Sequence, residues 1–307
     1  MIVKNEAHVI ERALESALPL VDFIYVEDTG SADDTPGIVL DFMAKHGIGG
    51  AVTHEPWQNF AFNRTHALNR LREGRGADYA LRLDADDILT FDDGFSAKAF
   101  KSQLDKDIYD VRIAYDTLAY SRPDLVSVNC HAVYKGVTHE YLEVSPDATR
   151  GTAEGFAIKI IGGGARHASG RKFETDAELL EKALETETDP FMLSRYRFYL
   201  AQSYRDAGLP SKALANYLLR ASLDGWVEER YVATYEAANL MWKLGFPAAQ
   251  VLGMYGRAID LIPTRAEALF AATMYSEGRR SPLTQPSAGL FLQPHTYRGK
   301  NDNSPVS

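Results

Sequence analysis

The chain has 307 residues, enough for one large or two ordinary domains, and its 45% hydrophobic and 24% charged residues are typical of a globular protein. A formal net charge of -9 argues against a nucleic-acid partner, so a phosphate-bearing substrate would need a metal ion or a local basic group. The single cysteine, Cys130, excludes an internal disulfide, and no apolar run is long enough to span a membrane.

Up to Thr90, short apolar stretches alternate with segments whose apolar residues recur at helical spacing. The stretches predicted as strands cover residues 1–3, 23–26, 51–53 and 77–83. The first of them starts at Met1 and looks short for a strand. Strand and helix in alternation are typical of a parallel sheet with crossover helices, so we expect an α/β fold here.

Asp84 and Asp86 directly follow the predicted strand 77–83. Ligands of open α/β sheets bind at the carboxyl edge, and alternate residues of an extended chain share a face. The two carboxylates can therefore converge on Mg2+ or Mn2+, which prefer oxygen ligands and usually also hold substrate phosphates. A solvated acidic turn is the competing interpretation of the same residues.

Polar side chains also follow the first and second predicted strands, at the same expected edge. Asp28 can accept hydrogen bonds from a ribose or a base N–H, or it can cap the next helix. Asn5 and Glu6 lie at the first strand–helix junction, where Glu6 is either a nucleotide contact or a partner of the helix dipole. Arg64 is a candidate for meeting a base or a phosphate, with a surface salt bridge as the alternative.

Beyond Thr90 the pattern predicts strands without long helices between them, so we expect the sheet to become mixed. The predicted strands are residues 108–114, 126–135 and 156–161, with a loop over 143–154. His139 beside Glu140 can activate a hydroxyl or bind a metal ion. His167 follows a glycine-rich turn and is either a third, imidazole ligand of the cation or a surface histidine.

Residues 174–278 are almost entirely helical in pattern and contain a repeat. Small and aromatic residues occur close to the spacing of a tetratricopeptide repeat, at Leu200, Ala201, Tyr204, Gly208, Ala213, Tyr217 and Gly225, with a less regular copy at Gly245, Tyr255, Ala258 and Pro263. This part is interpreted either as a platform for stability or as a groove for a protein partner. The polar tail after Arg280 is predicted to be disordered.

Several of these motifs together resemble family 2 glycosyltransferases. The resemblance rests on Met1-Ile2-Val3-Lys4-Asn5-Glu6, Val26-Glu27-Asp28-Thr29-Gly30-Ser31, Phe62-Asn63-Arg64 and Leu83-Asp84-Ala85-Asp86-Asp87, in this order and spacing. The cluster His139-Glu140-Tyr141-Leu142 is similar to one in bacterial members that build lipopolysaccharide cores. The resemblance implies a GT-A, Rossmann-like nucleotide-binding domain with a mixed sheet over residues 1–172, a tetratricopeptide-like helical domain over 173–280 and a tail over 281–307.

The resemblance also implies an inverting, metal-dependent hexosyltransferase that uses a nucleotide-diphosphate sugar. Glu6, Asp28 and Arg64, with Asn5, would hold the nucleoside, and Asp84 and Asp86 would hold Mg2+ or Mn2+ against the diphosphate. Glu140 is the expected base, oriented by His139, with Asp87 or Asp116 as alternatives. We expect a UDP-sugar donor and a glycan, lipid or protein acceptor, in the cytoplasm or at the inner face of the membrane.

Two other functions were weighed against this one. A transferase-like protein without activity could bind a partner through its helical repeats, although intact Asp84 and Asp86 argue against it. A phosphatase or phosphotransferase with Asp84 as nucleophile is disfavoured, because Ile88 stands where that chemistry has a threonine.

Overall fold

The computed structural model describes residues 1–278 apart from 75 and 169. They form two compact units, Met1–Gly170 and a helical unit that begins at Arg171. The predicted tail over 281–307 lies outside the described residues. Among the described residues, no helix is long and apolar enough to cross a membrane.

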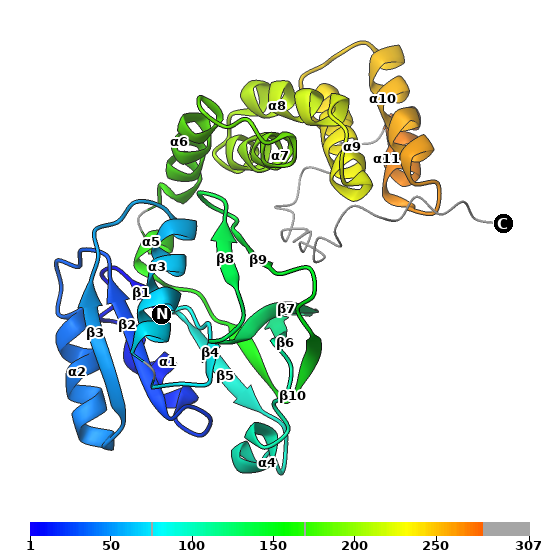
Figure 1. Cartoon of the computed structure of the whole chain (residues 1–307). Helices are drawn as coiled ribbons and strands as arrows, with labels where there is room; N and C mark the ends of the chain where they lie inside the picture. Colours follow the sequence, from blue (N-terminus) through cyan, green and yellow to red (C-terminus); the bar gives the residue numbers. More distant parts are fainter. Residues whose placement is uncertain (75, 169, 279–307) are drawn as a thin grey trace. The chain divides into compact units, whose positions relative to one another are not determined.

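The first half of the N-terminal unit is a three-stranded parallel sheet with helices in its crossovers (Figure 1). Its elements are β1 (Ile2–Val3), α1 (Ile10–Ala17), β2 (Phe23–Asp28), α2 (Thr35–His46), β3 (Gly49–His54) and α3 (Phe60–Glu73). Apolar residues from the sheet, α1 and α2 form one core, in which Ile10, Val26 and Val39 are fully buried. The predicted strand–helix alternation is therefore confirmed up to α3.

The second half is a five-stranded mixed sheet in the order β4-β7-β6-β10-β5, with a small β8-β9 ribbon beside α3. Its elements are β4 (Tyr79–Leu81), β5 (Asp87–Phe91), α4 (Ala97–Lys101), β6 (Ile108–Tyr115), β7 (Leu118–Ser127), β8 (Ala132–Lys135), β9 (Tyr141–Val144), β10 (Arg150–Ile160) and α5 (Ala165–Ala168). All pairings are antiparallel except β6 with β10. The expected mixed sheet is confirmed.

Three predicted segments differ from the structure. The strand predicted over 77–83 is shorter and pairs antiparallel with β7, so it ends before Asp84. The strand predicted over 126–135 is broken by a turn in which the Cys130 N–H donates to the Ser127 carbonyl. The loop predicted over 143–154 was wrong for most of its length, because β9 extends to Val144 and β10 begins at Arg150.

A buried carboxylate attaches α3 to β2. Glu27 is fully buried, and its Oε2 lies 2.6 Å from Nδ1 of His66, while Glu55 lies 3.7 Å from the other ring nitrogen. The Oε1 atom of Glu27 has no hydrogen-bond partner among the described residues. The fold therefore depends on His66 to compensate this charge.

We expect His66→Ala to lower the free energy of unfolding by about 3 kcal/mol, because the substitution leaves the Glu27 carboxylate buried without a partner. Urea denaturation measures the loss. Glu27→Gln/His66→Ala should recover part of it, since the buried charge is gone. An equal loss in the single and double variants would contradict this account.

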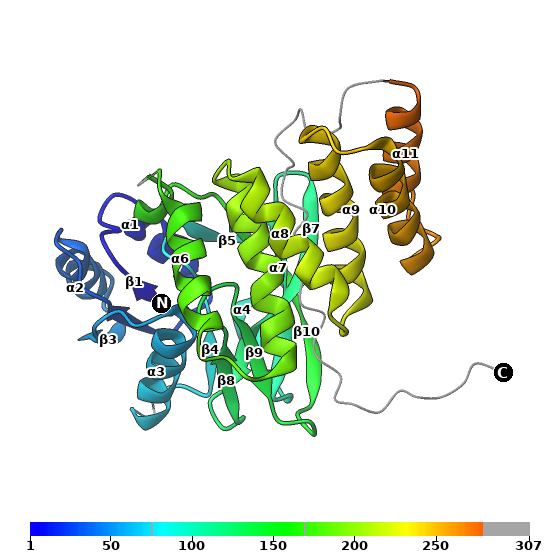
Figure 2. The ribbon, with the colours of Figure 1, turned by 90° about the horizontal axis from the view of Figure 1, so that it is seen from above.

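The described part of the helical unit, up to residue 278, contains six helices, and each from α7 on packs against the one before it in the chain (Figure 2). They are α6 (Lys172–Leu184), α7 (Pro190–Asp206), α8 (Pro210–Ser222), α9 (Val227–Lys243), α10 (Ala248–Leu261) and α11 (Glu267–Ser276). The small and aromatic repeat residues Ala201, Ala213 and Tyr217 are fully buried between helices. Gly208 and Gly245 have positive φ after α7 and α9, where glycine ends a helix without strain. This arrangement fits tandem helical hairpins.

Candidate functional site

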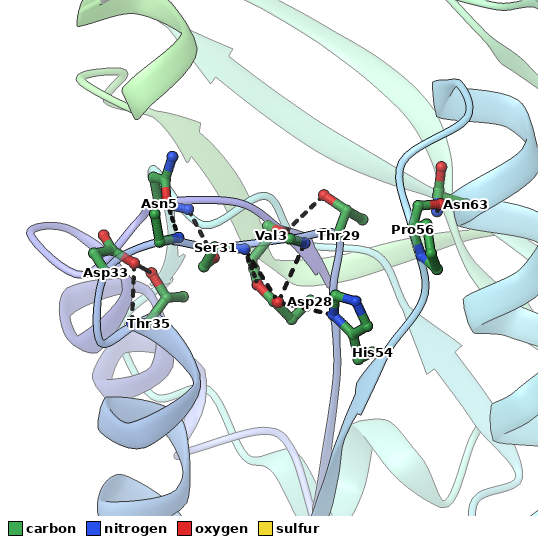
Figure 3. A network of polar contacts seen from close by, with 12 residues as sticks. Val3, Asn5, Asp28, Thr29, Ser31, Asp33, Thr35, His54, Pro56 and Asn63 are labelled. Atoms are coloured by element: carbon green, nitrogen blue, oxygen red, sulfur yellow. Dashed lines mark hydrogen bonds and ion pairs between the residues drawn. The ribbon is translucent and has the colours of Figure 1, made fainter.

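Asp28 ends β2 and shapes the loop that follows it (Figure 3). Its carboxylate accepts hydrogen bonds from the backbone N–H of Gly30 at 3.2 Å and of Ser31 at 3.1 Å, and lies 3.2 Å from Nδ1 of His54 at the end of β3. Gly30 has a φ of 107°, which favours glycine. Burial raises the pKa of Asp28, but the hydrogen bonds from Ser31, His54 and Gly30 outweigh it, so the pKa is lowered.

Asn5 connects this loop to the end of β1. Its backbone N–H donates to Ser31 Oγ at 2.8 Å, and its Oδ1 accepts from the N–H of Ala32 at 2.7 Å. Asn5 adopts a φ of 59°, a left-handed conformation that asparagine tolerates better than most residues. Through these contacts Asn5 holds the loop after β2 against the end of β1, at the carboxyl edge of the parallel sheet.

Asp84 lies in the turn between β4 and β5, where it faces two arginines. Arg64, from α3, donates from Nη2 to Asp84 Oδ1 at 2.8 Å, and Arg82 Nη1 lies 3.8 Å from Oδ2. Burial raises the pKa of Asp84, but the charges of Arg64 and Arg82 overcome it and hold the pKa far below its usual value. Asp84 is therefore ionised, and both of its oxygens face guanidinium groups.

Asp86 and Glu6 converge on the loop that joins β10 to α5. The N–H of Gly164 donates to Asp86 Oδ2 at 3.1 Å, and the N–H of Ala165 lies 3.2 Å from Glu6 Oε2. A Cβ at position 164 would lie 2.9 Å from Asp86 Oδ2 and 3.2 Å from Glu6 Oε1, so this close approach needs glycine. Burial raises the pKa of Glu6 and the hydrogen bond from Ala165 lowers it. The negative charge of Asp86 raises it further, so the pKa of Glu6 is raised overall.

Asp87, the first residue of β5, is buried beside these carboxylates. Burial raises its pKa to about 7, and the negative charges of Asp84 and Asp86 act in the same direction. Asp116 lies in the tight turn between β6 and β7, at a φ of 50°. Because Asp87 pairs with Ile160 and Lys159 pairs with Ala114, this turn lies at the same sheet edge as Asp87.

Glu140 precedes β9 and points at the same arginines. Its Oε1 lies 2.6 Å from Arg64 Nε and 3.7 Å from Arg82 Nη1. His139, immediately before it, has a φ of 52°. His167 lies in α5, but its side chain is outside the described residues, so its predicted role as a ligand stays a prediction.

At the Asp84–Asp86 turn, the described residues offer a divalent cation too few side-chain ligands to hold it without further ligands from a substrate or from solvent. Among the described residues, no group of three His, Cys, Asp or Glu side chains can hold a metal ion. Asp84 is engaged by arginines, whereas Asp86 keeps one carboxylate oxygen without a hydrogen bond among the described residues. This fits a Mg2+-like site, in which one or two carboxylates act together with substrate phosphates.

Residues 1–119 match the model of glycosyl transferase family 2. This segment is similar to family 2 glycosyltransferase domains. The resemblance drawn from the sequence motifs is thereby confirmed for this part of the chain, and the matched segment contains Glu6, Asp28, Arg64 and the Asp84–Asp86 turn.

A TPR repeat-containing protein of Synechococcus elongatus is 35% identical over 106 residues, which is 34% of this chain and 23% of the relative. The chain thus spans about a quarter of that relative's length. Among solved structures, S. aureus TarS 1–349 in complex with UDP-GlcNAc is similar at a TM-score of 0.43 and 14% identity, covering 91% of both chains. The complex of the same protein with UDP gives 0.42 and 13%, again over 91% of both.

The candidate site also contains residues that the sequence motifs did not single out. Arg82 bonds Asp124 at 2.7 Å and lies near both Asp84 and Glu140. It could have been found as the one charged residue in the otherwise apolar run from Tyr79 to Leu83. His54 and Gly164 carried no comparable signal, because their proximity to the site depends on pairing between distant segments.

Proposed function

We propose that the chain is an inverting, metal-dependent glycosyltransferase that moves a sugar from a nucleotide diphosphate, most simply a UDP-sugar, to an acceptor hydroxyl. The observation that supports it best is the grouping of Glu6, Asp84 and Asp86 around one edge, with Asp28 at the end of the neighbouring strand β2. A family 2 domain over the same residues supports the reaction class.

The donor's nucleoside fits the Asp28 loop. Asp28 stays ionised because its pKa is lowered, so its carboxylate can accept hydrogen bonds from ribose hydroxyls or a base N–H. His54 is largely exposed and lies 3.2 Å from that carboxylate, which gives the loop a polar wall. Glu6 and Arg64 are the further nucleotide contacts in this proposal.

The diphosphate belongs at the Asp84–Asp86 turn. Mg2+ or Mn2+ bound there would neutralise the charge that develops on the leaving nucleoside diphosphate. Asp86 is the residue with a carboxylate oxygen left for the cation, and Asp84 and His167 are the other proposed ligands. Arg64 and Arg82, both more than four-fifths buried, offset the charges of Asp84 and Glu140, which lowers the repulsion that phosphates would meet at this turn.

Inversion requires a base on the acceptor side that takes the hydroxyl proton during a single displacement. Glu140, with His139 beside it, and the alternatives Asp87 and Asp116 are the candidates. The acceptor is a glycan, a lipid or a protein, and contact with the inner face of a membrane would suit a lipid-linked one.

A second candidate function is protein binding through the helical unit. Leu269 and Phe270 on α11 are 59% and 61% exposed, the two highest values among the large apolar side chains of the described residues. In this case the unit would hold a protein partner or acceptor, with or without catalysis by the family 2 domain.

Asp86→Ala should reduce Mn2+-dependent hydrolysis of the donor at least about 100-fold, because the cation loses a protein ligand. A thermal-shift screen of UDP-sugars with and without Mn2+ first identifies the donor, and release of UDP then measures hydrolysis. The matched control is Asp93→Ala, which removes an exposed aspartate and should leave the rate unchanged.

Two outcomes would overturn the proposed function. One is the absence of any metal-dependent shift with every nucleotide sugar, which would favour the binding protein. The other is wild-type hydrolysis by the Asp86→Ala variant.

A further inference from the structure

Glu140 lies between two guanidinium groups. One oxygen, Oε1, is 2.6 Å from Arg64 Nε and 3.7 Å from Arg82 Nη1, and the side chain is 10% exposed. The arginine side chains are themselves only 8% and 13% exposed. The carboxylate therefore faces buried cations of its own chain.

Arg64 connects Glu140 to Asp84. Its buried Nε forms an ion pair with Glu140 that lacks hydrogen-bond geometry, while its Nη2 donates to Asp84 Oδ1 at 2.8 Å, so carboxylates flank the guanidinium on two sides. The ring of Phe60, whose centroid lies 5.9 Å from the guanidinium carbon, adds a further contact. A shift of Arg64 would therefore move or release the Asp84 carboxylate.

Arg82 is held independently of Glu140. Its Nε donates to Asp124 Oδ1 at 2.7 Å, and Arg122 takes the other oxygen of Asp124 at 2.6 Å. Loss of Glu140 would thus leave Arg82 anchored but would deprive Arg64 of one of its two carboxylates. The effect of Glu140 on the site is expected to pass through Arg64 to Asp84.

A general base needs an oxygen within hydrogen-bond reach of the acceptor hydroxyl and a pKa near the working pH. Burial raises the pKa of Glu140, but the charges of Arg64 and Arg82 outweigh it, and the pKa is lowered. The carboxylate is thus more weakly basic than an ordinary glutamate, which suits a structural anion better than a proton acceptor.

We infer that Glu140 is a positioning residue, which fixes the Arg64 guanidinium and through it the Asp84 carboxylate at the donor site. This role rests on the proposed function for its effect on catalysis, but the contact itself does not. It replaces proton transfer as the task of Glu140 and leaves Asp87 and Asp116 as the remaining candidates for the base.

Binding of UDP with Mn2+, measured by calorimetry, separates the two roles. Glu140→Ala should raise the Kd about tenfold or more, with Arg64→Met behaving alike, since both release Asp84. Glu140→Gln keeps the volume and one oxygen toward Arg64 but loses the charge, so its Kd should lie between those of the wild type and Glu140→Ala, and its pH profile of donor hydrolysis should keep the shape of the wild type's. Glu143→Gln, at an exposed glutamate on β9, is the control that should change nothing.

A base would give the opposite pattern. A Kd within twofold of the wild type in Glu140→Ala, together with a loss of hydrolysis of about 100-fold or more in Glu140→Gln, would overturn the positioning role.

The Arg64 Nε–H proton gives a second measurement that needs no nucleotide. In the ligand-free protein its NMR signal, assigned with Arg64→Lys, should exchange slowly with solvent, and at least about ten times faster in Glu140→Ala. Equal exchange in the two proteins would overturn the inference even if no UDP-sugar bound. If the proton exchanged slowly in the wild type and faster in Glu140→Ala but no nucleotide bound, the positioning role would stand and only the proposed function would be overturned.

Discussion

Arg64→Ala should lower the free energy of unfolding by about 3–5 kcal/mol, because it leaves Glu140, which is 10% exposed, and Asp84, which is 30% exposed, without their closest cation. Arg64 lies 2.8 Å from Asp84 and 2.6 Å from Glu140, and its side chain is 8% exposed. Denaturation in urea at pH 7.5, with the slope checked against that of the wild type, measures the loss.

Arg70→Ala is the control for this prediction. Arg70 is on the same helix and bonds Glu73, but the two side chains are 51% and 63% exposed, so its loss should cost less than about 1 kcal/mol. Adding Glu140→Gln to Arg64→Ala should restore part of the stability, since one of the stranded charges is removed. Similar losses for Arg64→Ala and Arg70→Ala would show that the buried network contributes little.

The sequence predicted the first half of the fold because its elements are local. Each strand up to β3 is followed by a helix that carries the chain back to the edge of the sheet where that strand began. The next strand therefore runs parallel to it, and apolar spacing alone is enough to predict this arrangement. The position of Asp28 at the end of β2 follows from the same pattern, and so does that of Glu6 after β1.

The second half depends on pairing between distant segments. β4 ends at Leu81 because its partner is β7, in the register Leu81↔Leu125, and no spacing around residues 77–83 reveals this partner. The polar segment 150–154 was predicted as a loop, yet it is the exposed start of β10, paired with β6. A strand with one face in solvent tolerates such residues, so polarity alone misidentified it.

In the candidate site, too, the local motifs could be predicted from the sequence, whereas the contacts between distant segments could not. The Asp84–Asp86 motif and Arg64 are recognisable as single motifs, but their mutual contacts are not. That Asp84 faces Arg64 and Arg82, while Asp86 faces Gly164, reverses the expectation of two carboxylates turned alike toward one cation. The strand that would have aligned them ends before Asp84, so the alternation of an extended chain does not apply there.

Asp87→Asn should remove a pH-dependent loss of stability. Burial, Asp84 and Asp86 raise the pKa of Asp87 from 3.8 to about 7 in the folded chain. Between these values the folded state binds more protons than the unfolded state, so stability falls as the pH rises through this window and stays low above it. An asparagine keeps the shape of the neutral acid and carries no charge at any pH.

The stability advantage of Asp87→Asn over the wild type should therefore grow by about 2 kcal/mol between pH 5.5 and pH 8.5. Urea denaturation in the presence of EDTA measures it, because a bound cation would stabilise the ionised acid. Asp93→Asn, at an exposed aspartate, corrects for the change in net charge. If the advantage were constant with pH, Asp87 would be ionised at its usual value, and the crowding of carboxylates at this edge would be relieved by solvent or by the neighbouring arginines.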